Sequence, residues 1–332
     1  MRICVYGAGA VGGYLGVQLA LAGEDVTLIA RGPHLEAMRT NGVKLLIDDE
    51  ERVAHPRCIG DPAEAGEQDY VVVTLKAHSA PEVVDAMQPL LGPETAVVSA
   101  VNGVPWWYFH RLEGPWEGHR MESVDPGGVQ WDGLGPERAI GCVVYPATEV
   151  VEPGVIRHLE GNRFTLGEPS GEKTERVMAF AKALISAGFR APVRRIRDEI
   201  WVKLWGNLSF NPISALTLET LDVVATETGT RAVSKAMMLE AQTIGEKLGV
   251  RFPVDVEARI DGAAAVGAHR TSMLQDLERG RPMEVDALVT SVQEMGRLVR
   301  VPTPTIDVVL ALVQQRAHVA GAYEYPEGHS ED

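Results

Sequence analysis

The fold is decided by the stretch Arg2-Ile-Cys-Val-Tyr-Gly7-Ala8-Gly9-Ala10-Val11-Gly12 at the start of the 332-residue chain. After Arg2, residues 3–6 form a short apolar run, which suits a strand buried in a parallel sheet, and the glycines follow the pattern GxGxxG. An apolar helix and a second strand, residues 25–30, close a strand–helix–strand unit within roughly 30 residues. This context predicts a dinucleotide site formed by six consecutive residues: Gly7, Ala8, Gly9, Ala10, Val11 and Gly12.

Each glycine of the motif has a separate physical task. Gly7 allows the tight turn, and Gly9 lets the backbone approach a pyrophosphate. Gly12 lets the helix pack closely on the strand, and the amino end of that helix faces the phosphates.

The end of the second strand selects the cofactor. An acidic residue there would bind the ribose 2′-hydroxyl of NAD, whereas this chain has Ala30-Arg31. An arginine can pair bidentately with a 2′-phosphate, so NADPH is favoured. The alternative is that Arg31 is a surface arginine in a loop.

Two further predicted strands, residues 70–75 and 96–101, are followed by Lys76 and by Asn102-Gly103. Open α/β sheets bind ligands at the carboxyl ends of their strands. Lys76 is therefore a candidate for a cofactor phosphate or ribose, with a solvated lysine as the alternative. Asn102 is a candidate for the nicotinamide ribose or the substrate, with a plain turn as the alternative.

A second informative stretch, residues 200–212, is mostly apolar and is predicted to be helical. It is interrupted by Lys203, Asn207 and Asn211, spaced i, i+4 and i+8, which places all three on one stripe of a helix. Burying a lysine in such surroundings is costly unless a partner or ligand meets it. The stripe therefore predicts one wall of an active site. The alternative is that Lys203 reaches solvent and the asparagines cap neighbouring loops.

These patterns predict an α/β Rossmann-type domain over residues 1–196, an all-α domain over 197–322 and a mobile tail over 323–332. Short strands near residues 142–145 and 154–158 and a helix at 175–187 are expected to complete the first domain and its sheet. In the second domain the 3.6-residue periodicity predicts helices at 199–219, 229–248, 253–268, 283–300 and 304–320.

Composition limits the partners. A net charge of −15 argues against a nucleic-acid or anionic-membrane binder, and no apolar run approaches the roughly 20 residues that span a bilayer. Three cysteines without CxxC spacing argue against a disulfide framework or zinc site and favour a reducing cytoplasm; Cys4 is expected to be a small buried residue. Apolar helical faces of the second domain could form a homodimer.

Spacing leaves two features open. The aromatic run at residues 106–109 can pack in the core or line a pocket, and Glu284 can be a first-turn acid favoured by the helix dipole. For a third feature, spacing alone favours a Ser272 that caps a helix and an Asp276 that faces solvent.

The ordered motifs resemble those of ketopantoate reductases over nearly the whole chain. They are the glycine motif of residues 7–13, Val73-Thr-Leu-Lys76, Asn102-Gly103, Lys203-Leu-x-x-Asn207-x-x-x-Asn211-Pro212, Ser272-Met-Leu-Gln-Asp276 and Glu284-x-Asp286. The resemblance implies a Rossmann domain that binds NADPH, a helical domain that closes over it, and reduction of a small-molecule 2-oxo acid.

It also implies roles for individual residues. Lys203 would be the general acid, with Glu284 beside it and the cofactor. Asn207 and Asn211 would hold the substrate, and Ser272 would contact its carboxylate. Asn102 would touch both cofactor and substrate.

This chain departs from the pantoate-forming pattern at two positions. Leu221 and His269 stand where asparagines are expected, and the segment 104–141 is long. These departures suggest a bulkier or aromatic 2-oxo acid as the alternative to ketopantoate. A non-catalytic NADPH-binding sensor is a remote alternative, because it would not need a lysine aligned with two asparagines.

Overall fold

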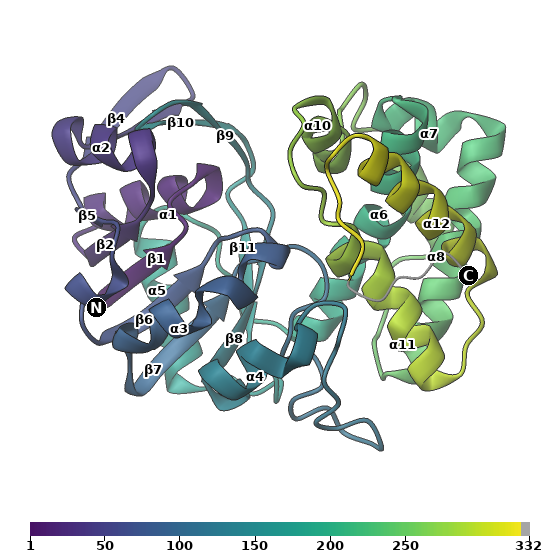
Figure 1. Ribbon diagram of the computed structural model, residues 1–332, viewed down its shortest axis with the longest axis horizontal. Helices are drawn as coiled ribbons and strands as arrows, with labels where there is room; N and C mark the ends of the chain where they lie inside the picture. The colour runs from purple at the N-terminus through teal and green to yellow at the C-terminus, as the bar shows by residue number, and fades with distance from the viewer. Residues whose placement is uncertain (327–332) are drawn as a thin grey trace. The chain divides into compact units, whose positions relative to one another are not determined.

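The computed structural model describes residues 1–326, which form two compact units that divide between Glu199 and Ile200 (Figure 1). The boundary predicted at residue 196 lies within the same segment, where one helix runs from the first unit into the second. Of the predicted tail, residues 327–332 lie outside the described part. No helix among the described residues is long and apolar enough to cross a membrane.

The first unit is built on a seven-stranded sheet. Its strand order is β11-β8-β7-β6-β1-β2-β5, and all neighbours are parallel except β11 and β8. The bounds are β1 (Arg2–Tyr6), β2 (Asp25–Ile29), β5 (Arg57–Ile59), β6 (Gln68–Val73), β7 (Leu91–Ser99), β8 (Ala139–Val144) and β11 (Phe164–Gly167). The chain leaves β1 toward β2 on one side and returns on the other as β6. The crevice between β1 and β6 is therefore the switch point where such sheets bind ligands.

A second, four-stranded sheet was not predicted. Its order is β4-β3-β10-β9, with bounds β3 (Val43–Ile47), β4 (Glu50–Ala54), β9 (Ala147–Glu152) and β10 (Val155–Glu160). The strand expected near residues 154–158 thus lies in this sheet, and its placement in the main sheet was wrong.

The second sheet explains why helix α1 (Ala10–Leu21) is apolar on every side. A side chain on Gly13 would meet Ile156 of β10 at 2.7 Å, so the second sheet packs directly on this helix. A helix that is hydrophobic all round is normally covered all round. The sequence carried this signal, but not the identity of the strands that cover α1.

The remaining helices of the first unit are short. They are α2 (Gly32–Asn41), α3 (Val84–Met87), α4 (Val129–Leu134) and α5 (Glu175–Ser186), and the helix predicted at 175–187 is confirmed. Residues 190 and 193 form only isolated bridges with residues 163 and 166, so the segment 191–196 is a linker at the sheet edge.

The aromatic run belongs to the core of the first unit. Trp106 is 4% exposed, and Trp107, Tyr108 and Phe109 are 0% exposed. The indole nitrogen of Trp107 donates to Ser99 Oγ at 3.1 Å, which ties the long segment to the end of β7. These rings are therefore packing residues.

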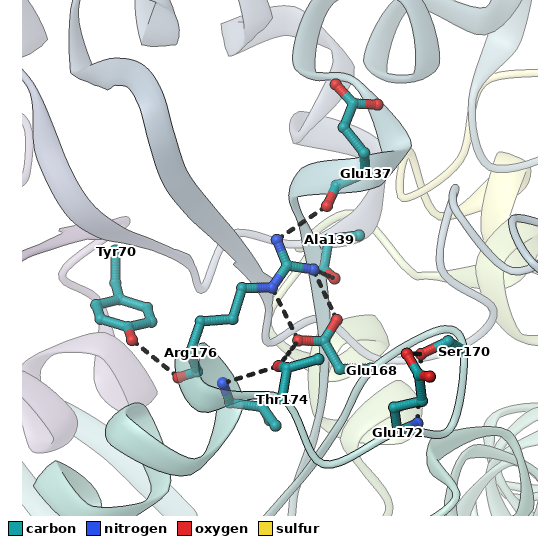
Figure 2. A network of polar contacts seen from close by, with 9 residues as sticks. Tyr70, Glu137, Ala139, Glu168, Ser170, Glu172, Thr174 and Arg176 are labelled. Carbon is teal, nitrogen blue, oxygen red and sulfur yellow. Dashed lines mark hydrogen bonds and ion pairs between the residues drawn. The ribbon is translucent and has the colours of Figure 1, made fainter.

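An ion pair fixes α5 to the sheet. The Arg176 guanidinium donates to both carboxylate oxygens of Glu168, at 2.8 and 2.6 Å, and also to the backbone carbonyls of Glu137 and Ala139 (Figure 2). Glu168 is only 3% exposed. A buried carboxylate is tolerated when it is paired and hydrogen-bonded in this way, so this network is structural.

The second unit is helical, which confirms the fold class. It contains α6 (Ile196–Thr217, begun in the first unit), α7 (Leu221–Thr226), α8 (Thr228–Lys247), α9 (Val256–Ala264), α10 (Ser272–Glu278), the π-helix η7 (Asp286–Thr290), α11 (Ser291–Val299) and α12 (Pro304–Val319). The helix predicted at 253–268 is shorter, and the one predicted at 283–300 opens with the π-turn. Helices α7 and α10 are too short to show a period.

The first residue of the predicted mobile tail is packed, so the prediction was wrong at Tyr323. Tyr323 is 8% exposed, and its hydroxyl donates to Asp286 Oδ1 at 2.9 Å and accepts from Gln314 Nε2 at 3.1 Å. Burial, followed by the charge of Asp286, raises the pKa of this phenol well above its usual range. The Tyr323 ring is thus anchored to the helical unit through Asp286 and Gln314.

Candidate active site

The glycine turn has the shape that a pyrophosphate needs. Gly7 has φ +103°, a conformation that L side chains rarely adopt. A Cβ on Gly12 would lie 2.5 Å from Thr74 Oγ1 and would also clash with Gly7 O, whereas a Cβ on Gly9 would have nothing within 4 Å. Gly12 therefore permits close helix–strand packing, and Gly9 borders open space.

This open space lies at the amino end of α1. Gly9 is the N-cap residue and supplies no side-chain cap, so the first backbone N–H groups of the helix remain available to an anion. The backbone of the predicted residues 7–12 therefore fits a dinucleotide phosphate.

Two side chains that were not predicted as site residues hold the turn in place. Thr74 Oγ1, just beyond β6, donates to Gly7 O at 2.7 Å. His34 of α2 lies 2.8 Å from Ala8 O through Nε2, and its Nδ1 accepts from the Gly154 N–H at 3.0 Å. Because Nδ1 must accept, Nε2 carries the proton and donates. The sequence signal for Thr74 was its place in the segment Val73-Thr-Leu-Lys76.

Arg31, the residue predicted to bind the 2′-phosphate, lies two residues beyond the end of β2. It is exposed at the N-cap position of α2. Burial raises the pKa of the Tyr6 phenol at the end of β1, and the nearby charge of Arg31 counteracts part of that rise. Arg31 thus lies near the ends of both strands that flank the glycine turn.

We expect Arg31→Ala to raise the KM for NADPH by about 10- to 100-fold, since a hydrogen-bonded charge typically contributes about 1.5–3 kcal/mol. The KM for NADH should change less than about twofold, because NADH has no 2′-phosphate. Steady-state titration of both cofactors tests this. Equal changes for the two would refute the assignment.

Lys76 and Asn102 are half-buried beyond the carboxyl ends of β6 and β7. Both strands run parallel to β1, so the two residues share the sheet edge with the glycine turn. Gly103 has φ +85° and forms the turn after Asn102. The structure therefore brings the predicted cofactor residues of this unit to one edge.

The lysine–asparagine stripe lies on α6 as predicted. Between residues 200 and 215 every side chain is buried except those of Val202, Lys203 and Asn207, which are half-buried. Asn211 is 5% exposed, and its Nδ2 donates to Ser272 Oγ at 3.3 Å. Thus Asn211 reaches α10 and positions the serine, rather than capping a loop.

The structure corrects two predictions for α10. Its cap is Thr271, whose Oγ1 accepts from the Leu274 N–H at 3.3 Å, so the exposed Ser272 has no capping task. Asp276 does not face solvent: it is 6% exposed and pairs with Arg281 at 3.2 Å. Ser272 is therefore the polar group that α10 presents beside the α6 stripe.

Glu284 is half-buried and lies just before the π-helix η7. π-Turns are rare in proteins overall, but those that occur are frequently found at functional sites. This one is braced through Asp286 Oδ1, which accepts from Thr290 Oγ1 at 2.7 Å and from the Tyr323 hydroxyl. Glu284 is thus presented from a braced, irregular turn and not from the first turn of a regular helix.

The two departures from the pantoate-forming pattern are neighbours. The Leu221 N–H donates to the His269 carbonyl at 2.8 Å. The replacement of two amides is therefore a single local change in the second unit.

A parallel sheet with a dinucleotide turn at its switch point, combined with a helical unit that presents a lysine among amides, defines a nicotinamide-dependent oxidoreductase. Family models assign both parts more narrowly. The model "Ketopantoate reductase PanE/ApbA" matches residues 3–171, and its C-terminal counterpart matches residues 195–317. The chain belongs to the ketopantoate reductase family.

Individual relatives agree with this assignment. A 2-dehydropantoate 2-reductase of Mesorhizobium japonicum is 61% identical over 97% of this chain and 100% of its own length. A solved structure from Ralstonia solanacearum MolK2 has a TM-score of 0.93 at 44% identity, covering 97% and 99% of the two chains. A PanE/ApbA family ketopantoate reductase from Ralstonia eutropha JMP134 has a TM-score of 0.82 at 27% identity, covering 96% and 99%.

Proposed function

We propose that this enzyme reduces 2-dehydropantoate to pantoate with NADPH, and that Lys203 is the proton donor. The 61% identity to a 2-dehydropantoate 2-reductase over both full lengths supports the substrate. The observation that carries the mechanism is the α6 stripe. Its side chains Lys203 and Asn207 are half-buried polar groups in a helix segment that is otherwise mostly buried.

NADPH, when bound, supplies the hydride to the carbonyl carbon of the 2-oxo acid. The ketone oxygen then gains negative charge, and Lys203 Nζ donates a proton to it. One hydride and one proton together convert the ketone to a secondary alcohol, with the cofactor oxidised to NADP⁺ in the balance. Glu284 is the carboxylate assigned to position the lysine.

The remaining residues bind and orient. Asn207 holds the substrate directly, and Asn211 fixes Ser272, whose hydroxyl is assigned to the substrate carboxylate. Asn102 is assigned to the cofactor and the substrate, and Lys76 to the cofactor. The glycine turn and Arg31 hold the phosphates of the cofactor.

Incubation of the enzyme with NADPH and 2-dehydropantoate tests this function. Loss of the NADPH absorbance should equal the pantoate formed, measured by mass spectrometry. If NADPH is bound but not consumed with any 2-oxo acid, the chain is a sensor and the proposal fails. Since pantoate is a precursor of pantothenate, we place the enzyme in pantothenate synthesis in the cytoplasm.

We also propose that the enzyme is a homodimer formed through the outer face of α12. This helix is apolar on two sides: one side packs inward, while Val308, Leu312 and Val319 are 60%, 49% and 75% exposed. An exposed apolar stripe of this kind is a candidate contact surface between protein chains.

The sequence of α12 fits a second copy of itself. In an antiparallel pair centred between Ala311 and Leu312, these two residues face each other across the two-fold axis, as an isologous contact requires.

Leu312→Asp is expected to convert the dimer to a monomer, because it places two like charges on the symmetry axis. Light scattering after size exclusion gives the mass directly. Val266→Asp, at a site that is 55% exposed and away from α12, should remain dimeric. A wild-type enzyme that is monomeric at micromolar concentration would contradict the proposal.

A further inference from the structure

One cationic side chain lies over the active-site stripe and has no role yet. At about 100° per residue, Val202, Lys203, Gly206 and Asn207 point into one arc of α6. Gly206 lies inside this arc but is buried, because Arg259 of α9 covers it. The Cζ atom of Arg259 is 3.4 Å from the point where a Gly206 Cβ would be, and Nη2 is closer still.

Gly206 is what makes room for this guanidinium. Any side chain at residue 206 would occupy the same volume, and the same point is already 3.8 Å from the ring of Phe210. The glycine needs no unusual backbone conformation in the middle of α6, so its absence of a side chain is the relevant property. A glycine in a helix interior otherwise costs about 1 kcal/mol relative to alanine.

The acids of α9 are engaged elsewhere. Glu257 and Asp261, two residues before and after Arg259, both pair with Arg231 of α8, at 2.6 and 2.8 Å. Residues two apart on a helix point to nearly opposite sides. Arg259 is thus directed away from these carboxylates and toward α6, where it is half-buried.

The chemistry of this place suits an anion. A guanidinium is planar and always charged, and it binds a carboxylate bidentately. The only ionisable partner that the proposed reaction brings to the α6 stripe is the carboxylate of the 2-oxo acid. Leu221 and His269 stand where the pantoate-forming pattern has asparagines, so this chain has two fewer amide side chains in the second unit.

We propose that Arg259, seated over Gly206, binds the carboxylate of the 2-oxo acid whose ketone oxygen receives the proton from Lys203. This inference rests on the proposed function. It adds a charged substrate contact from α9 to the hydroxyl of Ser272, and it makes Gly206 a specificity-determining residue because it leaves space for that contact.

The test compares 2-dehydropantoate with its lactone, which keeps the ketone but has no carboxylate. We expect Arg259→Ala to raise the KM for the acid by about 10- to 100-fold, the usual effect of losing a charged hydrogen bond. The KM for the lactone should change less than about twofold. Gly206→Ala should also raise the KM for the acid, although Arg259 is still present. Arg259→Lys should have a lower KM for the acid than Arg259→Ala.

Controls separate this inference from a structural role and from the function itself. Arg297→Ala, at an exposed arginine of the same unit, should change neither KM. If Arg259→Ala raises the two KM values equally, or leaves that for the acid unchanged, Arg259 is a packing residue and only this inference fails. If the wild-type enzyme turns over no 2-oxo acid, the proposed function fails, and the inference with it.

Discussion

Replacing Lys203 by alanine is expected to lower kcat for 2-dehydropantoate by about 100- to 10,000-fold, the usual contribution of a general acid. The physical reason is that charge develops on the ketone oxygen as the hydride arrives, and no other side chain of the α6 stripe can donate a proton at neutral pH. The KM for NADPH should change little, because the residues assigned to the cofactor lie at the edge of the sheet.

The folded state should survive this change. Lys203 is only half-buried, while its neighbours Leu204 and Trp205 remain in the core at 2% and 0% exposure. Thermal unfolding should therefore shift by only a few degrees. Lys182→Ala, at an exposed lysine of α5, is the matched control and should retain full turnover. A Lys203→Ala enzyme whose kcat is within threefold of the wild type would remove the lysine from the mechanism.

The second large effect is expected at the glycine turn. Two variants there should weaken NADPH binding for different physical reasons. In Gly12→Ala the new Cβ would lie 2.5 Å from Thr74 Oγ1 and would also meet the Gly7 carbonyl. Overpacking of this kind typically costs about 1–3 kcal/mol. Relief of this clash requires α1 to move away from β1. We therefore expect both a lower melting temperature and a loss of NADPH affinity of more than about 100-fold.

Gly9→Ala should separate binding from folding. A Cβ there meets nothing within 4 Å, so the melting temperature without ligand should equal that of the wild type. The same methyl group would stand where the pyrophosphate approaches the backbone, and the affinity for NADPH should fall by about 10-fold or more. Calorimetry with and without NADPH measures both quantities. Unchanged affinity in Gly9→Ala would show that the pyrophosphate lies elsewhere.

The sequence was most informative where chemistry and local geometry coincide. The glycine motif lies between a strand and a helix, so its placement required no knowledge of distant contacts. The α6 stripe follows from helical periodicity alone, and the burial of the residues around Lys203 and Asn207, except Val202, agrees with it. Both features depend on residues that are close in the chain.

Non-local pairing was not predictable in the same way. The second sheet joins β3 to β10 in parallel, with Leu45 beside Ile156, and nothing local in either strand specifies that partner. Asp276 was expected in solvent for a different reason: Arg281 is close in the chain but reaches it only through the turn that follows α10. The apolar character of α1 on all sides was the signal that an additional layer existed.

Some details of the site could not be predicted from the sequence for a different reason. Ser272 and Thr271 are both good caps, and only the structure shows that Thr271 takes this task and leaves Ser272 to Asn211. Arg259 belongs to no sequence motif. Its proposed role depends on its contact with Gly206, which is distant in the chain. Such residues can be found only when the packing around the stripe is known.

The most direct test of the central claim is a comparison of kcat/KM for NADPH oxidation with 2-dehydropantoate, phenylglyoxylate and 2-oxoisovalerate. We predict that 2-dehydropantoate is preferred by orders of magnitude, which would show that Leu221 and His269 are tolerated changes. A preference for phenylglyoxylate or 2-oxoisovalerate would contradict the claim, and would show that these two neighbouring residues redirect the pocket on an unchanged catalytic frame.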